Sequence, residues 1–261
     1  MSKVKHQVVA IIQARMGSSR LPGKVMKKIC GIPMLGWVAE RAKMAKLLDK
    51  VVIATTISEE DNPIANYCLK QDYAIFRGSV FDVLDRYYQA ALNYRADVIV
   101  RITADCPLID PSLIDEVVHK FLKAEVDFAA NRLPPPFKRT YPIGLDVEVA
   151  SFIALKRTWL EAQEPHEREH VMPYLYEKSG RFKVITVDYD LDYGHYRWTV
   201  DTAKDLEFIR QVTAHLNCRK DFSWLDVLKV IKKHPKLMKI NAQVMHKSYI
   251  DVDGRMQRKK K

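Results

Sequence analysis

Residues 8–24 read VVAIIQARMGSSRLPGK, and this stretch decides the fold class. Its first five residues form a continuous apolar run, as expected for a parallel strand that is buried on both faces. A loop rich in glycine, serine and cations follows directly. Because ligands of open α/β sheets bind beyond the carboxyl ends of the strands, we expect this loop to face a ligand.

The loop over residues 14–24 has the composition of a phosphate-binding segment. Its glycines let the backbone approach an oxyanion closely, and its serines and N–H groups can donate hydrogen bonds. Its cations can neutralise several phosphate charges, so we predict a nucleoside triphosphate as the ligand. The residues concerned are Ala14, Arg15, Gly17, Ser18, Ser19, Arg20, Gly23 and Lys24.

Two familiar phosphate-binding motifs do not match this loop. A Walker loop has the form G-x-x-x-x-G-K-[ST], but the segment from Gly17 to Gly23 is one residue too long, and Val25 follows Lys24. A dinucleotide fingerprint has the form G-x-G-x-x-G, with a third glycine that this loop lacks. A solvent-exposed basic turn is the remaining alternative.

Short apolar runs alternate with amphipathic stretches along the chain, which is typical of βαβ units around a parallel sheet. Polar side chains that can cap a helix lie at the start of three of the expected helices: Ser79, Asp110 and the pair Asp201-Thr202. The proline-rich residues 134–142 are interpreted as a loop. We expect strands at residues 8–12, 51–54, 74–76, 98–102, 128–130, 145–149 and 183–187. We expect helices at residues 34–46, 80–94, 110–123, 152–162, 167–178, 203–216 and 223–233, and a further helix that begins at residues 61–63.

The composition is that of a globular protein. The chain has 261 residues, of which 48% are hydrophobic and 29% charged, and this excludes bulk disorder. Its apolar runs are far shorter than the roughly 20 residues that span a bilayer, and the N-terminus has no apolar signal core. We therefore predict a soluble, cytoplasmic protein without a membrane span.

The cysteines give no sign of a metal knuckle or a disulfide framework. Cys30, Cys68, Cys106 and Cys218 are far apart in sequence, and none forms a C-x-x-C pair. A chain of this size does not need disulfides to fold, so we expect reduced thiols, in keeping with a cytoplasmic protein.

The positive charge is concentrated at the C-terminal end. The net charge is +11, of which residues 219–261 contribute +9 and residues 1–218 only +2. We expect a main domain over residues 1–218 and a basic extension over 219–261, made of a helix and a mobile tail. Nucleic acid is not expected as a partner, because the basic segment has neither a recognition motif nor clustered stacking aromatics.

Residues 14–24 closely resemble the signature of the sugar-acid cytidylyltransferases, the enzymes that activate Kdo and acylneuraminates as CMP-sugars. The full pattern, over about residues 6–250, is most similar to the spore coat polysaccharide biosynthesis branch of that family. The resemblance implies a doubly wound three-layer α/β sandwich of the nucleotide-diphospho-sugar transferase (GT-A-like) type. It also implies CTP and a sugar acid as substrates, suggests a homodimer, and assigns phosphate binding to Arg15, Arg20 and Lys24.

Two aspartates are candidates for a Mg²⁺ site. Asp105 follows the strand at residues 98–102, and a carboxylate beside a triphosphate is the usual means of recruiting Mg²⁺. Asp105 resembles the acidic residue of the family's metal-binding strand end, although Cys106 stands where the Kdo branch has a second acid. Asp201 resembles the first aspartate of the family's late V-D-T-x-x-D-L motif. A turn or cap role is the alternative for both aspartates.

Further residues are candidates for binding the nucleoside and the sugar. The resemblance places Gly78, Ser79 and Asp82 beside the cytosine base, with a surface pair between Asp82 and Arg86 as the alternative for these two side chains. We also assign substrate binding to Arg101, in the same motif as Asp105.

Asp146 and Glu148 have strand spacing and would point to one side, where they could recognise hydroxyl groups. The resemblance assigns His170 to the sugar pocket. Residues 166–170, HEREH, match the zinc motif H-E-x-x-H by spacing, but a zinc site would leave the phosphate loop without a purpose. The loop at residues 134–142 is expected to shape the same pocket.

The predicted reaction is attack of a sugar-acid hydroxyl on the α-phosphorus of CTP, with release of pyrophosphate, for surface polysaccharide biosynthesis. We expect catalysis by Arg15, Lys24 and Asp105, with Mg²⁺ held by Asp105 and Asp201. Two alternatives remain open. One is a glycosyltransferase of the same architecture that uses a nucleotide-sugar, and the other is a polyanion-binding protein that acts through the basic C-terminal tail.

Overall fold

The computed structural model describes residues 5–133 and 138–245. The predicted mobile tail therefore lies outside the described residues, as does part of the predicted loop at 134–142. Every helix in the described part of the chain is too short or too polar to cross a membrane.

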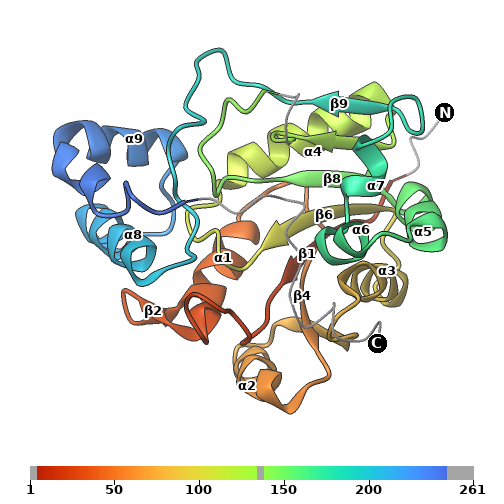
Figure 1. Ribbon diagram of the computed structural model, residues 1–261, viewed down its shortest axis with the longest axis horizontal. Helices are drawn as coiled ribbons and strands as arrows, with labels where there is room; N and C mark the ends of the chain where they lie inside the picture. The colour runs from red at the N-terminus through yellow and green to blue at the C-terminus, as the bar shows by residue number, and fades with distance from the viewer. Residues whose placement is uncertain (1–4, 134–137, 246–261) are drawn as a thin grey trace.

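A seven-stranded sheet forms the centre of the molecule (Figure 1), in the order β5-β4-β1-β6-β8-β7-β9. β8 runs antiparallel to both of its neighbours, and the other pairs are parallel. A small hairpin of β2 and β3 lies apart from this sheet. The strands are β1 Val8–Gln13, β2 Lys28–Ile29, β3 Ile32–Pro33, β4 Lys50–Thr56, β5 Ala74–Gly78, β6 Val98–Thr103, β7 Phe128–Ala130, β8 Glu148–Ser151 and β9 Val184–Thr186.

Helices cover both faces of the sheet and make the three layers of the sandwich (Figure 1). Residues from α1, α2, α4, α8 and α9 pack on one face, and residues from α3, α5 and α7 pack on the other. The helices are α1 Met34–Ala42, α2 Asn62–Lys70, α3 Val83–Asn93, α4 Pro111–Ala124, α5 Phe152–Glu161, α6 Pro165–His170, α7 Pro173–Tyr176, α8 Ala203–His215 and α9 Trp224–Lys233, with short 3-10 turns at Lys24–Met26, Glu59–Asp61 and Pro235–Lys239.

β1 is buried on both sides, as the apolar run predicts. Ala10 and Ile12 belong to the core on the face of α1, whereas Val9 and Ile11 belong to the core on the face of α3. Successive side chains of a strand point to opposite faces, so an unbroken apolar run is needed to fill both cores. The prediction of a doubly wound α/β sandwich is confirmed.

The order of the strands places the ligand site. From β1 the chain crosses to β4 and β5 on one side, and then returns to β6 on the other side of β1. This reversal is a topological switch point, where ligands of open α/β sheets bind. The loop after β1 and the loop after β6 leave the same edge of the sheet at that point.

Three predicted helices differ in extent. The helix expected at residues 34–46 ends at Ala42. The helix expected from Ser79 begins at Val83, because the Asp82 carboxylate caps it and accepts the N–H of Asp85 at 2.9 Å. The helix expected at residues 167–178 is divided into α6 and α7. Val171 between them has φ 72°, and Pro173 cannot donate to a continuing helix.

The strand expected at 145–149 begins only at Glu148. The side chain of Asn131 takes the place of the missing ladder: its Nδ2 donates to the Leu145 carbonyl at 2.7 Å, and its Oδ1 accepts the N–H of Val147 at 2.8 Å. Asp146 therefore lies in an irregular segment just before β8, so the expected strand spacing of Asp146 and Glu148 is wrong.

The first part of the basic C-terminal segment packs against the main body. Trp224, Val227 and Ile231 of α9 are buried in the same core as α1 and α4. The guanidinium of Arg41, which is wholly buried, donates to the carbonyls of Ile109 at 2.7 Å and Phe222 at 3.0 Å. Residues 219–245 thus share the core of residues 1–218.

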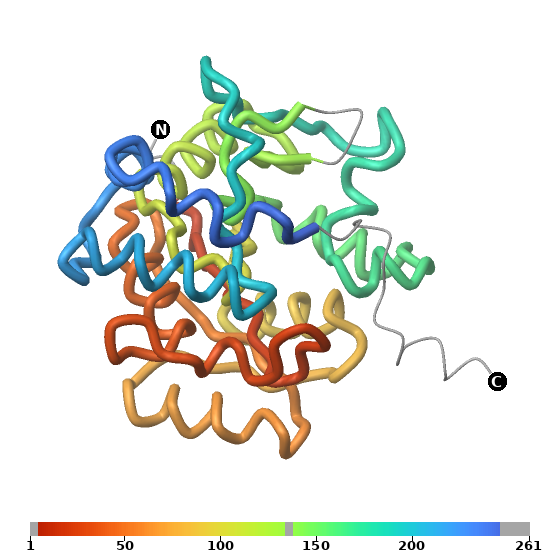
Figure 2. Tube along the Cα trace, turned by 60° about the vertical axis from the view of Figure 1, so that its left-hand side comes forward, coloured from red at the N-terminus to blue at the C-terminus, as the bar shows by residue number. Residues whose placement is uncertain are grey.

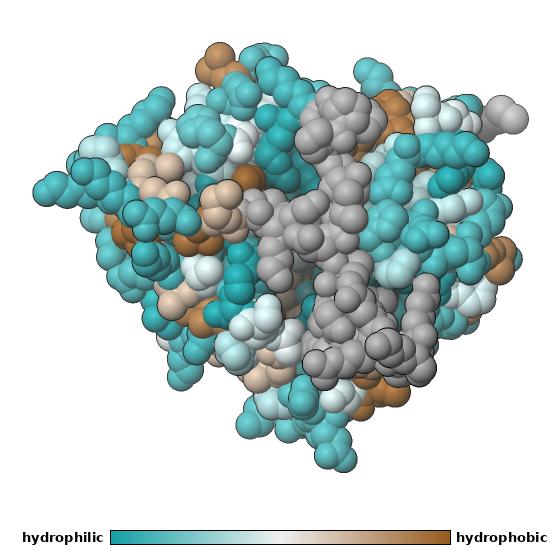
Figure 3. Space-filling view, in the orientation of Figure 1, coloured by the Kyte–Doolittle hydropathy of each residue, from teal (hydrophilic) through white to brown (hydrophobic). Residues whose placement is uncertain are grey.

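Hydrophilic residues dominate the face of the molecule seen in Figure 3, and apolar residues are scattered over it.

A disulfide joins Cys30, in the turn between β2 and β3, to Cys218, just after α8. Cys68 and Cys106 are free and buried. The expectation of four reduced thiols is therefore wrong for one pair. The two bonded cysteines are 188 residues apart in sequence, and only the packing of α8 beside β2 brings them together.

We predict that loss of this disulfide destabilises the protein. Cys30→Ser should lower the free energy of unfolding by about 2–4 kcal/mol, because a long loop of the unfolded chain is no longer closed. Denaturant unfolding with and without dithiothreitol measures the effect. Reduction should bring the wild type to the level of Cys30→Ser and leave the variant unchanged, and an equal response of both proteins would contradict the disulfide.

Candidate active site

The loop between β1 and the turn at Lys24–Met26 closes on itself. The Gly23 N–H donates to the Met16 carbonyl at 2.9 Å, and the Lys24 N–H donates to the Leu21 carbonyl at 3.1 Å. Gly23 has φ 65°, a left-handed conformation that other residues rarely adopt. The loop predicted to hold phosphates is therefore a compact turn at the carboxyl end of β1.

Asp61 anchors this loop to the rest of the sheet. Its buried carboxylate accepts the N–H of Met16 at 2.6 Å, and its other oxygen accepts the hydroxyl of Thr56 at the end of β4. The sequence analysis placed Asp61 only at a helix start. Its role depends on a contact between residues 45 positions apart, which no local pattern shows.

Lys24 lies between the two aspartates that were predicted to bind Mg²⁺. Its Nζ donates to Asp105 Oδ2 at 2.7 Å, to Asp201 Oδ1 at 2.9 Å and to the Val200 carbonyl at 2.8 Å. The side chain of Lys24 is only 12% exposed. Three residues that are far apart in sequence thus meet at one point, at the switch point of the sheet.

The charges of this cluster stabilise one another. Burial alone would lower the pKa of Lys24, but the carboxylates of Asp105 and Asp201 outweigh it and raise that pKa. Burial alone would raise the pKa of Asp201, but Lys24, Arg197 and Arg20 hold it well below the ordinary value. Both groups therefore stay charged near neutral pH.

Arg197, Asp205 and Asn241 hold Asp201 in place through a chain of hydrogen bonds. Arg197 donates to Asp201 Oδ2 at 2.6 Å and to Asp205 Oδ1 at 3.1 Å. Asn241 donates to the same Asp205 oxygen at 3.0 Å and to the Arg197 carbonyl at 3.1 Å. Thr202, with Asp205 in a capping box, caps α8. The N-cap role considered for Asp201 thus belongs to its neighbour.

The end of the described chain completes this side of the site. After α9 the chain crosses the molecule as the blue segment of Figure 2. Arg20 of the loop donates to the Met245 carbonyl at 3.2 Å and pairs with Asp201 Oδ2 at 2.9 Å. The sequence analysis missed Asn241 and this contact, because residues 236–245 have no periodicity that signals a function.

Of the predicted cations, Lys24 and Arg20 meet Asp201, whereas Arg15 lies toward α6 and pairs with Glu169 at 3.7 Å. The cations of the loop are thus spread over both sides of the switch point. Ala14 directly follows β1, and its N–H donates to the Ala54 carbonyl at 3.1 Å. Within the loop, the Ser18 hydroxyl accepts the Leu21 N–H at 3.4 Å.

The residues predicted beside the base form a second group, at the start of α3. Asp82 binds Arg168 of α6 through both carboxylate oxygens, and the Ser79 hydroxyl accepts the Asp82 N–H at 3.0 Å. Arg86 is buried and donates to the Ser79 carbonyl at 2.7 Å, so the surface pair of Asp82 and Arg86 is not formed. A side chain at Gly78 would come within 2.8 Å of Phe76.

The residues predicted for the sugar lie at the ends of β6 and β8. Arg101 and Glu148 form a buried ion pair across these two strands, and Asp146 pairs with Arg139 at 2.5 Å. His170 is the last residue of α6. Arg101 and Glu148 thus lie near the edge of the sheet from which the loop with Asp105 leaves.

The zinc motif of residues 166–170 is not assembled. The Nε2 atom of His166 lies 2.9 Å from Oε1 of Glu177, the residue that directly follows α7. Within the described residues, no group of three or more histidine, cysteine or acidic side chains could hold a metal ion.

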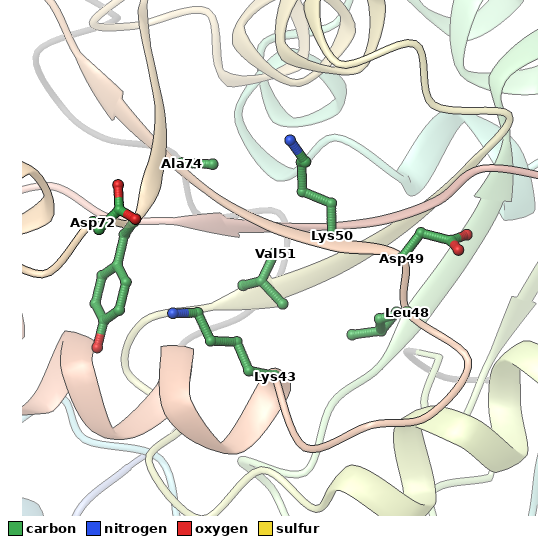
Figure 4. A pocket seen from close by; sticks show the side chains of 8 residues that line it. Lys43, Leu48, Asp49, Lys50, Val51, Asp72 and Ala74 are labelled. Atoms are coloured by element: carbon green, nitrogen blue, oxygen red, sulfur yellow. The ribbon is translucent and has the colours of Figure 1, made fainter.

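A surface hollow lies at the opposite edge of the sheet (Figure 4). Its walls are the amino ends of β4 and β5 and the loops before them, with Lys43, Asp49, Lys50 and Tyr73. The predicted site residues are absent from it, and ligands of such sheets bind at the carboxyl edge.

The chain belongs to the cytidylyltransferase family, whose model matches residues 9–246. It is 39% identical to an uncharacterized protein of Methanocaldococcus jannaschii, over 95% of this chain and 99% of that one. It is 29% identical to the spore coat polysaccharide biosynthesis protein SpsF of Bacillus subtilis, over 88% and 96% of the two chains. The predicted family is confirmed.

Solved structures support the same assignment. A cytidylyltransferase from Leptospira borgpetersenii has a TM-score of 0.85 and 36% identity, and covers 93% of this chain and 100% of its own. A CMP:2-keto-3-deoxy-manno-octonic acid synthetase complexed with CTP has a TM-score of 0.59 and 20% identity, over 80% and 99% of the chains. The fold is the nucleotide-diphospho-sugar transferase fold.

We predict that the charge cluster makes stability depend on acid pH. The pKa of Asp201 is depressed in the folded state, so its contribution is complete above its unfolded value of about 3.9 and is lost as the pH falls below it. Between pH 5 and pH 3, the wild type should lose more free energy of unfolding than Asp201→Asn. Parallel urea titrations test this, and equal losses would contradict the assigned network.

We also predict that Asp61 stabilises the loop. Asp61→Ala should cost about 1–3 kcal/mol of unfolding free energy, because the Met16 N–H and the Thr56 hydroxyl lose their acceptor. Asp61→Asn, which keeps one acceptor oxygen, should cost less. Glu60→Ala, in the same turn but exposed, is the control. If the two alanine variants unfold alike, the anchor has no energetic role.

Proposed function

We propose that this cytidylyltransferase couples CTP to a sugar acid, with release of pyrophosphate, and that it serves surface polysaccharide biosynthesis. The observation that carries this proposal is the meeting of Lys24, Asp105 and Asp201 beside the compact loop of residues 14–23. The similar proteins support the choice of substrates and of the biosynthetic role. One structure of the same fold is a CTP complex of a sugar-acid synthetase. SpsF is named as a spore coat polysaccharide biosynthesis protein.

The loop supplies the groups that bind a triphosphate. Arg15, Arg20 and Lys24 neutralise its charge, and the backbone N–H groups of residues 17–19 and the serine hydroxyls donate hydrogen bonds. Gly23 closes the loop that holds these donors. Gly78, Ser79 and Asp82, at the end of β5, contact the base. The sugar acid lies toward β6 and β8, with Arg101, Asp146, Glu148 and His170.

The oxygen atoms around Lys24 Nζ fit a divalent cation. Two carboxylates and one carbonyl surround a single point at 2.7–2.9 Å, and hard oxygen donors are the ligands that Mg²⁺ prefers. Asp105 and Asp201 would hold the ion, which when bound would neutralise charge on the phosphates. A protein of the same fold from Mycobacterium tuberculosis forms a manganese complex, which supports a divalent cation.

The Lys24 ammonium and such an ion would compete for the carboxylates of Asp105 and Asp201. With the ion bound, Lys24 would be free to donate to the phosphates. The loop thus moves a positive charge from the aspartates to the nucleotide. The sugar hydroxyl then forms a bond to the α-phosphorus, the bond to the pyrophosphate oxygen breaks, and the hydroxyl proton is released.

The proposed reaction is tested by mixing the protein with Mg²⁺, each of the four nucleoside triphosphates and a panel of sugar acids. We expect pyrophosphate release with CTP that requires a sugar acid. A thermal-shift series with the same triphosphates measures binding independently of turnover. A glycosyltransferase would release no pyrophosphate, and absence of both a CTP-dependent shift and pyrophosphate would overturn the proposal.

We predict opposite effects of Lys24→Ala on turnover and on metal binding. Turnover should fall by several orders of magnitude, because a phosphate ligand is lost. The affinity of the nucleotide-free protein for Mn²⁺ should rise, because no ammonium competes for Asp105 and Asp201. Electron paramagnetic resonance counts free Mn²⁺, and Lys28→Ala, at an exposed position nearby, is the control. Unchanged turnover, or weaker Mn²⁺ binding, would contradict these roles.

A further inference from the structure

A group of arginines and carboxylates lies at the carboxyl edge of the sheet, beyond the triphosphate loop. Arg101 stands near the end of β6, Glu148 begins β8, and Arg132 follows β7 by two residues. Arg139 and Asp146 lie just before β8 and complete the group, which we call the arginine cluster.

Each carboxylate of the arginine cluster already has an arginine donor. Arg101 Nη1 donates to Glu148, and both side chains are almost wholly buried. Arg139 Nη1 donates to Asp146 at 2.5 Å. These two pairs are the ordinary way in which charges are buried.

Arg132 differs from the other two arginines in its hydrogen bonds. The Nε atoms of Arg101 and Arg132 are both buried without an acceptor, but Arg101 and Arg139 each donate to a carboxylate through Nη1. The Nε of Arg132 lies 3.7 Å from Asp146 Oδ2, too far for a hydrogen bond. Within the described residues, no hydrogen bond from its guanidinium is formed. Its side chain is 22% exposed although its Nε is buried, so a ligand would meet the terminal nitrogens of the guanidinium.

The arginine cluster has a net positive charge, which one bound anion would neutralise. Three guanidinium groups face two carboxylates, which leaves one positive charge in excess. Burial would lower the pKa of Arg132, but Glu148 and Asp146 outweigh it and raise that pKa, so the group stays charged. A charged guanidinium without a hydrogen-bond acceptor is costly to hold in a protein, and a ligand that supplies an acceptor to its terminal nitrogens offsets that cost.

An anion bound to Arg132 would lie away from the triphosphate loop. The sheet order places β7 three strands from β1, which is about 14 Å at ordinary strand spacing, but only two strands from β6. The triphosphate loop follows β1 and has its own cations, whereas the strand end of β6 leads to Asp105. The anion beside Arg132 therefore belongs to the second substrate.

We propose that Arg132 binds the carboxylate of the sugar acid, and that the pair of Arg101 and Glu148 positions it. A guanidinium matches a carboxylate in shape and can donate two parallel hydrogen bonds to it. This inference rests on the proposed function, because it assumes a sugar acid as the second substrate. It makes Arg132 the residue that distinguishes sugar acids from neutral sugars.

A side-chain NMR titration tests binding without knowledge of the sugar. The Nε–H resonance of Arg132, identified by its loss in Arg132→Lys, should shift saturably with sodium acetate and with 3-deoxy-manno-octulosonate, and should not shift with sodium chloride at equal ionic strength. If neither carboxylate shifts this resonance, the inference is overturned. A CTP-dependent rise in melting temperature, measured on the same sample, shows separately whether the proposed function stands.

Kinetics test the role in substrate selection. With a sugar acid that supports pyrophosphate release, Arg132→Gln should raise the KM of the acid about 10- to 100-fold and leave the KM of CTP unchanged. Arg132→Lys keeps the charge, so its KM for the acid should lie between those of the wild type and Arg132→Gln. Arg139→Gln removes one charge from the same cluster and is the matched control. An equal change in the KM of CTP, or an effect of Arg139→Gln as large, would overturn the assignment.

Discussion

The contact of the Lys24 ammonium with Asp105 and Asp201 joins three parts of the chain that the fold brings together. The loop after β1, the loop after β6 and the segment before α8 each contribute one of these side chains. Without the lysine, two carboxylates would face each other in a half-buried site, which like-charge repulsion disfavours. The cation and the triphosphate that we propose would bind at this same contact.

Support for this contact comes from residues that touch no phosphate. Asp61 holds the loop through the Met16 N–H, and Arg197, Asp205 and Asn241 hold Asp201. Because Asn241 comes from the basic C-terminal segment, residues 219–245 serve the site as well as the core. The positive charge of that segment is thus not by itself a sign of nucleic acid binding.

The sequence analysis succeeded where a signal is local. The apolar run of β1, the glycines and cations of the following loop, and the cap at Asp110 each depend on a few consecutive residues, and each lies where it was expected. It failed at β8, where the more distant Asn131 takes the hydrogen bonds of the first expected residues and so delays the start of the strand. It also failed locally at α3, where two candidate caps stand close together and Asp82 rather than Ser79 caps the helix.

The sequence by itself determined the fold class, the phosphate-type loop and the two aspartates at strand and helix ends, because hydrophobic periodicity and residue chemistry act over short distances along the chain. Only the tertiary structure decided the partners of Lys24, the disulfide between Cys30 and Cys218, and the long ion pair of Arg132 with Asp146 beside two hydrogen-bonded arginines. These depend on which strand ends adjoin, and sheet order is set by the packing of both cores together rather than by any single segment.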